Sequence, residues 1–116
     1  MIIMLSYTLE NIINQLGRMF TLYKSQLRTG DRLFLKTCNS LYSIQVAEDG
    51  HYLVSGGWFD KHNLSPFRIK ISGCTFGGSI IKTDIIAAPG LRLEFENRLV
   101  TSPVQRIFLF PLYRGN

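Results

Sequence analysis

The sequence has few charged residues and no long apolar run. Both observations limit the class of protein to which the chain can belong. Only 18% of the 116 residues are charged while 46% are hydrophobic, a balance that excludes an intrinsically disordered chain. No apolar stretch reaches the roughly 20 residues that span a bilayer. The apolar residues 1–5 lack the basic start and cleavage site of a secretory signal. We therefore expect a soluble, cytoplasmic protein with no membrane partner.

Cysteine and histidine are also scarce, with two residues of each type in the whole chain. A scaffold stapled by disulfides usually carries more cysteines in a shorter chain, so we predict that Cys38 and Cys74 are free thiols. His51 and His62 stand singly, without the paired spacing of a zinc site. The sequence therefore predicts neither a bound metal nor another cofactor.

No combination of residues indicates catalysis. The glycine spacing in residues 73–78 resembles a phosphate-binding loop, but Ser79 stands where that motif requires lysine. Glu94 and Glu96 would share one face of a strand and are flanked by arginines, which is typical of an exposed charged surface. We identify no catalytic residue and expect a non-catalytic protein.

Residues 8–27 have the apolar period of an amphipathic helix. Their large apolar side chains recur at spacings of three and four, which places them on one helix face. The segment 29–31 contains Gly30, which ends the pattern. The apolar positions are Leu9, Ile12, Ile13, Leu16, Phe20, Tyr23 and Leu27.

After Gly30 the apolar period changes to two, the period of a half-buried strand. We predict a mainly β (α+β) protein, with the N-terminal helix packed on a small curved antiparallel sheet or a partly open β-barrel of 5–7 strands. The length is that of one domain, residues 1–116, with a β-rich part over about residues 31–111. The predicted strands are residues 32–38, 41–47, 51–56, 67–71, about 80–86, 91–96 and about 104–110.

The first hairpin is predicted from the requirement that apolar faces coincide. A two-residue turn at residues 39–40 pairs Leu35 with Ile44 and Leu33 with Val46. These four side chains then lie on one face. We therefore predict this register.

The second hairpin contains Asp-Gly, but a two-residue turn at residues 49–50 would mix the two faces of the sheet. A three-residue turn at residues 48–50 pairs Val46 with Tyr52 and keeps the apolar faces together. We predict a type I turn closed by a glycine bulge, with Gly50 in the left-handed region.

The loop over residues 55–66 holds the densest cluster of potentially functional side chains. It combines the only tryptophan, a second aromatic residue and three ionisable groups, and long loops in compact domains are often functional. In the alternative reading, one of the two aromatic residues folds back and closes the core. The candidate ligand-binding residues are Trp58, Phe59, Asp60, Lys61 and His62.

A second candidate site follows from the net charge of +5, which favours anionic partners. Phe34, Lys36, Arg68 and Lys70 lie opposite the predicted apolar face. Small β-barrels bind single-stranded nucleic acid through such basic grooves and stacked aromatic residues. The signature patterns of the common RNA-binding sheets are missing, and the alternation alone does not place these four residues side by side.

Two functional hypotheses remain open at this point. The first is a small non-catalytic binding or protein-interaction module, which could form a homodimer through the helix or an open sheet edge. The alternative is a small basic β-barrel that binds RNA or single-stranded DNA.

Overall fold

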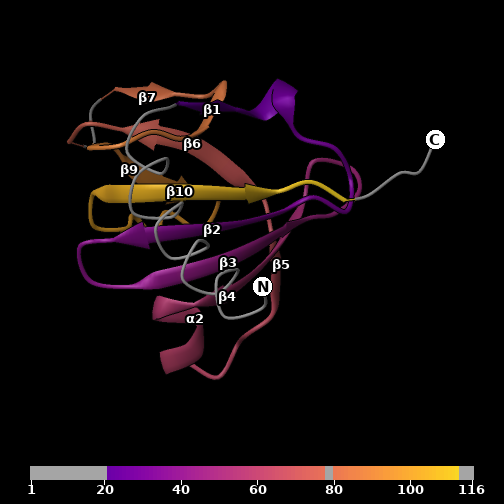
Figure 1. Ribbon diagram of the computed structural model, residues 1–116. Coiled ribbons are helices and arrows are strands. Elements are labelled where there is room, and N and C mark those ends of the chain that lie inside the picture. The colour runs from indigo at the N-terminus through magenta and orange to yellow at the C-terminus, as the bar shows by residue number, and fades with distance from the viewer. Residues whose placement is uncertain (1–20, 78–79, 113–116) are drawn as a thin grey trace, which may run out of the picture.

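The computed structural model describes residues 21–77 and 80–112, which form a mainly β unit of ten strands and two short helices (Figure 1). This confirms the predicted mainly β class. No helix in the described residues is long and apolar enough to cross a membrane. The strands are β1 (Leu22–Tyr23), β2 (Arg32–Thr37), β3 (Leu41–Val46), β4 (Tyr52–Gly56), β5 (Phe67–Ile69), β6 (Ile71–Thr75), β7 (Ile81–Lys82), β8 (Ile85–Ala87), β9 (Arg92–Phe95) and β10 (Val104–Phe110); the helices are η1 (Lys24–Gln26, a 3-10 helix) and α2 (Gly57–Lys61).

The strands form three antiparallel sheets. The largest has the order β10-β2-β3-β4-β5, and the two smaller ones have the orders β7-β6-β9 and β1-β8. Only Lys70 separates β5 from β6, so the chain passes directly from the large sheet into a small one. The predicted number of 5–7 strands in one sheet or barrel is wrong, because the described residues form ten strands in three sheets. These strands form no closed barrel.

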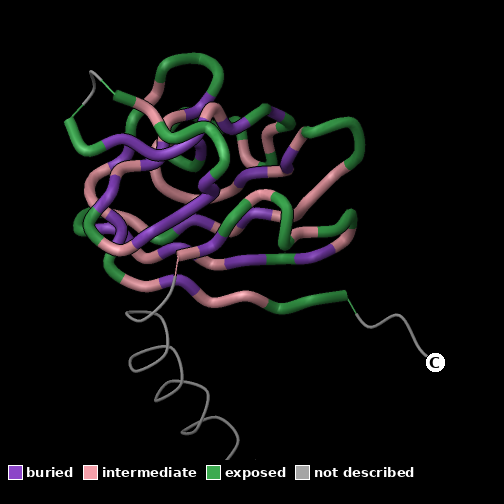
Figure 2. The backbone as a smooth tube through the Cα atoms, turned by 90° about the horizontal axis from the view of Figure 1, so that it is seen from above, coloured by how far each residue is buried: buried purple, intermediate pink, exposed green. Residues whose placement is uncertain are grey.

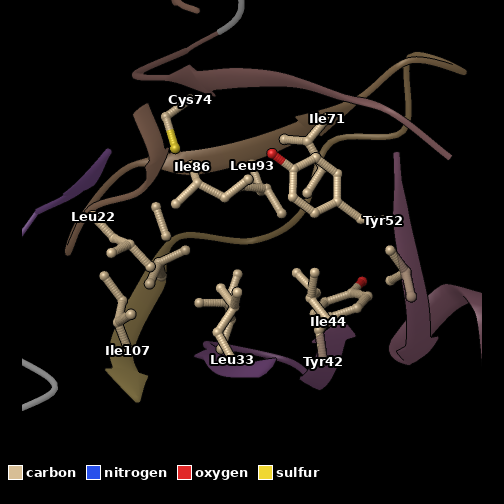
Figure 3. Close-up of a cluster of buried hydrophobic side chains, with 14 of the residues drawn as sticks. Leu22, Leu33, Tyr42, Ile44, Tyr52, Ile71, Cys74, Ile86, Leu93 and Ile107 are labelled. Atoms are coloured by element: carbon tan, nitrogen blue, oxygen red, sulfur yellow. The ribbon is translucent and has the colours of Figure 1, made fainter. Parts of the chain in front are cut away.

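The hydrophobic core lies between the large sheet and the smaller sheets. In Figure 3, side chains from β2, β3 and β10 face side chains from β6, β8 and β9. Buried residues recur along the strands, whereas exposed residues gather in the turns and at residues 110–112 (Figure 2). Fully buried members of the core include Leu33, Leu35, Ile44, Val54, Ile86, Leu93, Phe95 and Ile107.

The hairpin between β3 and β4 has the predicted register, which pairs Val46 with Tyr52. Gly50 has a φ of 75°, as predicted. The predicted type I turn is wrong, because Asp49 also has a positive φ, of 58°. Two positive φ values in the hydrogen-bonded turn 48–51 are typical of a type I′ turn, whose twist matches that of the strands.

The predicted register of the β2–β3 hairpin is wrong by two residues. Leu35 pairs with Tyr42 instead of Ile44. The turn begins one residue earlier than predicted, because the Thr37 hydroxyl accepts a 3.0 Å hydrogen bond from the Ser40 amide and donates one of 3.1 Å to the Ser40 carbonyl. A shift of two keeps every side chain on its predicted face, so the apolar pattern does not distinguish the two registers.

The predicted helix is wrong over residues 21–27, which form β1, η1 and an extended end. Leu22 is 1% exposed, and β1 pairs with β8. The Lys24 amide donates to the Asp84 carbonyl at 2.9 Å, and the Lys24 ammonium donates to the Ile71 carbonyl at 2.8 Å. These long-range contacts outweigh the local helical period. The rest of the predicted helix, residues 8–20, lies outside the described residues.

Two further segments differ from the predictions. The single strand predicted over residues 80–86 is split into β7 and β8 by a turn at Thr83 and Asp84. The predicted loop over residues 55–66 contains the short helix α2. In contrast, the last strand has the predicted bounds, Val104–Phe110.

Candidate functional site

The side of the large sheet that faces away from the core is here called the outer face. Successive side chains of a strand point to opposite sides, and directly paired residues point to the same side, so the register defines this face. Its members are Arg32, Phe34 and Lys36 of β2, Leu41, Ser43 and Gln45 of β3, Leu53 and Ser55 of β4, Arg68 of β5, and Arg106, Phe108 and Phe110 of β10.

Three phenylalanines cluster on the outer face where β2 and β10 are paired. The ring centroids of Phe34 and Phe110 are 5.6 Å apart in an edge arrangement, and those of Phe108 and Phe110 are 4.3 Å apart. Phe110 is 38% exposed. Phe34 and Phe108 are half-buried. Within the described part of the chain, all three rings lie on the side of the sheet that faces away from the core, where they offer aromatic area to a ligand.

The same face is basic. Arg32, Lys36, Arg68 and Arg106 all belong to it, and none of its members is acidic. Lys36 and Arg106 are direct cross-strand partners, an arrangement that costs stability because like charges lie side by side. The Nε atom of Arg106 is buried without a hydrogen-bond partner. A bound anion would relieve the repulsion between the two cations.

A shallow hollow of about 220 Å³ lies on the outer face beside the aromatic cluster. It spans β2, β3 and β4 and reaches the start of β5. Its walls combine a cation, an amide, two hydroxyl groups and two apolar side chains. The lining residues are Arg32, Ser43, Gln45, Leu53, Ser55 and Pro66.

Of the four residues proposed from the sequence for nucleic-acid binding, the structure places Phe34, Lys36 and Arg68 on the outer face. Lys70 is exposed but lies beyond the end of β5, at the junction with β6. Sequence reasoning missed the contribution of β10. A bulge between Val104 and Arg106 interrupts its alternation, and its position beside β2 is set by the tertiary structure.

Phe59, one of the candidate ligand-binding residues, belongs to the core. It is 0% exposed, and its ring centroid lies 5.1 Å from that of Phe95 and 6.4 Å from that of Tyr42. The alternative reading, in which an aromatic residue of this loop folds back to close the core, therefore holds for Phe59.

Asp60 and His62 interact within their own loop. The Asp60 carboxylate accepts a hydrogen bond from the Ser65 hydroxyl and one of 2.9 Å from the Gly56 amide, and these bonds lower the pKa of Asp60. The His62 ring stacks on Trp58 at a centroid distance of 4.2 Å. Both side chains thus stabilise the turn that follows β4.

Trp58 and Lys61 are the two members of the predicted loop site that line a hollow. The hollow has a volume of about 210 Å³ and lies between α2, the β2–β3 turn and residues 99–102. Trp58 is partly buried and contacts the core, and Lys61 is exposed. The structure therefore separates the five residues of the loop into core, turn and surface members.

The two cysteines are unlinked, as predicted. Cys38 is exposed, whereas Cys74 is 0% exposed and burial raises its pKa to about 12. We expect one thiol of the native protein to react with iodoacetamide near pH 8, and both to react after denaturation, because the thiolate is the nucleophile. Mass spectrometry of the alkylated protein would measure this. Equal labelling of both cysteines in the folded state would contradict the buried placement of Cys74.

Comparison of the chain with protein-family models, curated proteins and solved structures found no match. In the described part of the chain, no three histidine, cysteine, aspartate or glutamate residues are grouped so that they could hold a metal ion. The aromatic and basic outer face is the feature from which we infer function.

Proposed function

We propose that the protein is a non-catalytic module that binds single-stranded nucleic acid across the outer face of its large sheet. The observation that carries the proposal is the combination, on one sheet face, of three phenylalanines and four cations with no acidic residue. Single strands are bound by stacking of bases on aromatic side chains and by cations along the backbone, and each stacked base contributes about 1–3 kcal/mol.

The arrangement of the charges supports this ligand. Lys36 and Arg106 lie side by side at one end of the aromatic cluster. Arg32 pairs with Phe110 at the other end, and Arg68 lies on the same cross-strand row, three strands away. With neighbouring strands about 5 Å apart, this row spans about 14 Å. A strand whose bases stack on the phenylalanines thus has cations on both sides for its phosphates.

A homodimer formed through the outer face is disfavoured by the same charges. A two-fold interface brings the same patch of both copies together, so four cations would face four cations without an acidic partner. Among the described strands, β10 is an edge of the large sheet, and a protein partner could pair with this edge. Light scattering coupled to size exclusion would detect a dimer formed in this way.

We expect a fluorescein-labelled single strand of about 12 nucleotides to bind with an affinity that falls as salt rises. Fluorescence anisotropy should give a slope of about −2 to −3 in a plot of log affinity against log salt, because each phosphate contact on a single strand contributes about −0.7.

Phe34→Ala should weaken binding about 5- to 150-fold through loss of stacking. Lys36→Gln should weaken it about fivefold near 0.1 M salt and make the slope shallower.

Lys82→Gln is the matched control for the charge, because Lys82 is an exposed lysine on β7 in another sheet. It should leave affinity and salt slope unchanged, and thermal melting should show that all variants are folded. Absence of binding, or binding that Phe34→Ala does not weaken, would overturn the proposal. A dimer that binds no oligonucleotide would point instead to a protein-interaction module.

A further inference from the structure

We infer that the hollow lined by Arg32 and Gln45 holds one nucleobase of the bound strand and prefers guanine. The inference rests on the proposed function and adds a base preference to it. A general single-strand binder needs only stacking and charge. The hollow adds polar side chains that can form hydrogen bonds with the edge of a base. A general single-strand binder does not need such groups.

The walls of the hollow are arranged as a planar base requires. Leu53 and Pro66 supply apolar surface for the faces of the ring. Ser43 and Ser55 are direct cross-strand partners and place two hydroxyl groups in the adjacent row. The volume of about 220 Å³ lies below the roughly 300–1,000 Å³ of pockets for drug-sized ligands, and this size suits one base rather than a whole nucleotide.

Arg32 and Gln45 face each other across β2 and β3. Within the described part of the chain, neither side chain has a hydrogen-bond partner. A guanidinium donates two parallel hydrogen bonds, and the O6 and N7 atoms of guanine accept such a pair. The Gln45 amide oxygen can accept from the N–H groups of the same base. Adenine would instead direct its N6 amino donors at the Arg32 donors, so guanine is favoured over adenine.

The hollow lies next to the aromatic cluster in the sheet. Arg32 lies between Phe110 and Gln45 on one cross-strand row, and Phe34 lies beside Ser43 on the next row. Neighbouring strands are about 5 Å apart, so a base stacked on Phe34 and a base in the hollow lie one or two strand spacings apart. A strand that crosses the sheet from β10 towards β4 therefore presents adjacent bases to the two places.

The test uses four labelled 11-nucleotide thymidine strands that carry G, A, C or T at the central position. We expect the wild-type protein to bind the G strand about 5- to 150-fold more tightly than the all-thymidine strand, because a bidentate contact contributes about 1–3 kcal/mol of discrimination. Gln45→Leu should reduce the preference for guanine, because the amide oxygen that accepts from the base is lost. Arg32→Lys should abolish the preference and keep the salt slope, because lysine retains the charge but not the planar fork.

Gln105→Leu is the matched control, because Gln105 is an exposed glutamine on β10 whose amide contacts Cys38 and not the hollow. It should leave the preference for guanine intact. Equal, salt-dependent binding of all four strands would overturn the base preference and leave the proposed function standing. Binding of none of them would overturn both. A preference that survives Gln45→Leu and Arg32→Lys unchanged would show that these residues do not read the base.

Discussion

Truncation of Phe59 to alanine should lower the free energy of unfolding by about 3–5 kcal/mol. Phe59 is 0% exposed, and its ring contacts the rings of Tyr42, Trp58, Phe67 and Phe95. Removing the ring loses its transfer free energy and leaves a cavity that these four neighbours fill only in part. Urea denaturation monitored by circular dichroism would measure the change.

Phe76→Ala is the matched control, since Phe76 is 72% exposed after β6. The same truncation at this surface position should change stability by no more than about 0.5 kcal/mol. A loss below about 1 kcal/mol for Phe59→Ala would contradict its place in the core. It would also restore Phe59 as a candidate ligand-binding residue of its loop.

Gly56→Ala should destabilise the protein by about 3 kcal/mol or more, because two effects combine. Gly56 has a φ of 100° and a ψ of 176°, a region that is essentially limited to glycine. An added Cβ would also lie 2.1 Å from the carbonyl oxygen of Leu41, which is backbone on the paired strand and cannot swing away. The melting temperature of the variant would report this loss.

Gly77→Ala provides the control for the Gly56 substitution. Apart from Gly77 and its chain neighbours, no atom of the described residues lies within 4 Å of the Cβ position at Gly77, and its φ is outside the left-handed region. We expect this variant to be as stable as the wild type, or more stable by up to about 1 kcal/mol, because alanine restricts the unfolded chain. Similar melting temperatures for the Gly56 and Gly77 variants would show that the junction of β4 and α2 tolerates a side chain.

These two substitutions bear on the function because they concern the loop that the sequence singled out. Composition alone made residues 58–62 the strongest candidate, since aromatic and ionisable side chains are concentrated there. In the structure, Gly56 allows a sharp turn and Phe59 closes the core. Part of the unusual composition is therefore explained by folding, and the outer face becomes the better candidate for binding.

Alternation of apolar and polar residues was enough to predict most strands and the side to which each side chain points. Strand β10 has the predicted bounds, and the β3–β4 register follows because any slip of one residue would expose Ile44 and Val54. The outward directions of Phe34, Lys36 and Arg68 were predicted in the same way. Local pattern suffices for these features because burial of one sheet face is repeated at every second residue.

Other features depend on contacts between distant parts of the chain. Residues 21–27 have a helical apolar period, yet Leu22 is buried by pairing of β1 with β8, more than 60 residues later. The β2–β3 register depends on side-chain hydrogen bonds at Thr37, because a shift of two residues leaves the apolar faces unchanged. Such choices are decided by tertiary contacts that the local pattern does not contain.

The candidate binding site also depends partly on the local sequence pattern and partly on tertiary contacts. The sequence by itself determined that Phe34 and Lys36 of β2 point away from the core. Only the tertiary structure placed β10 beside β2 and thereby brought Phe108, Phe110 and Arg106 next to Phe34 and Lys36. The physical reason is that alternation along a strand specifies the direction of a side chain, whereas neighbours across a sheet are set by strand order, which depends on how the whole core packs.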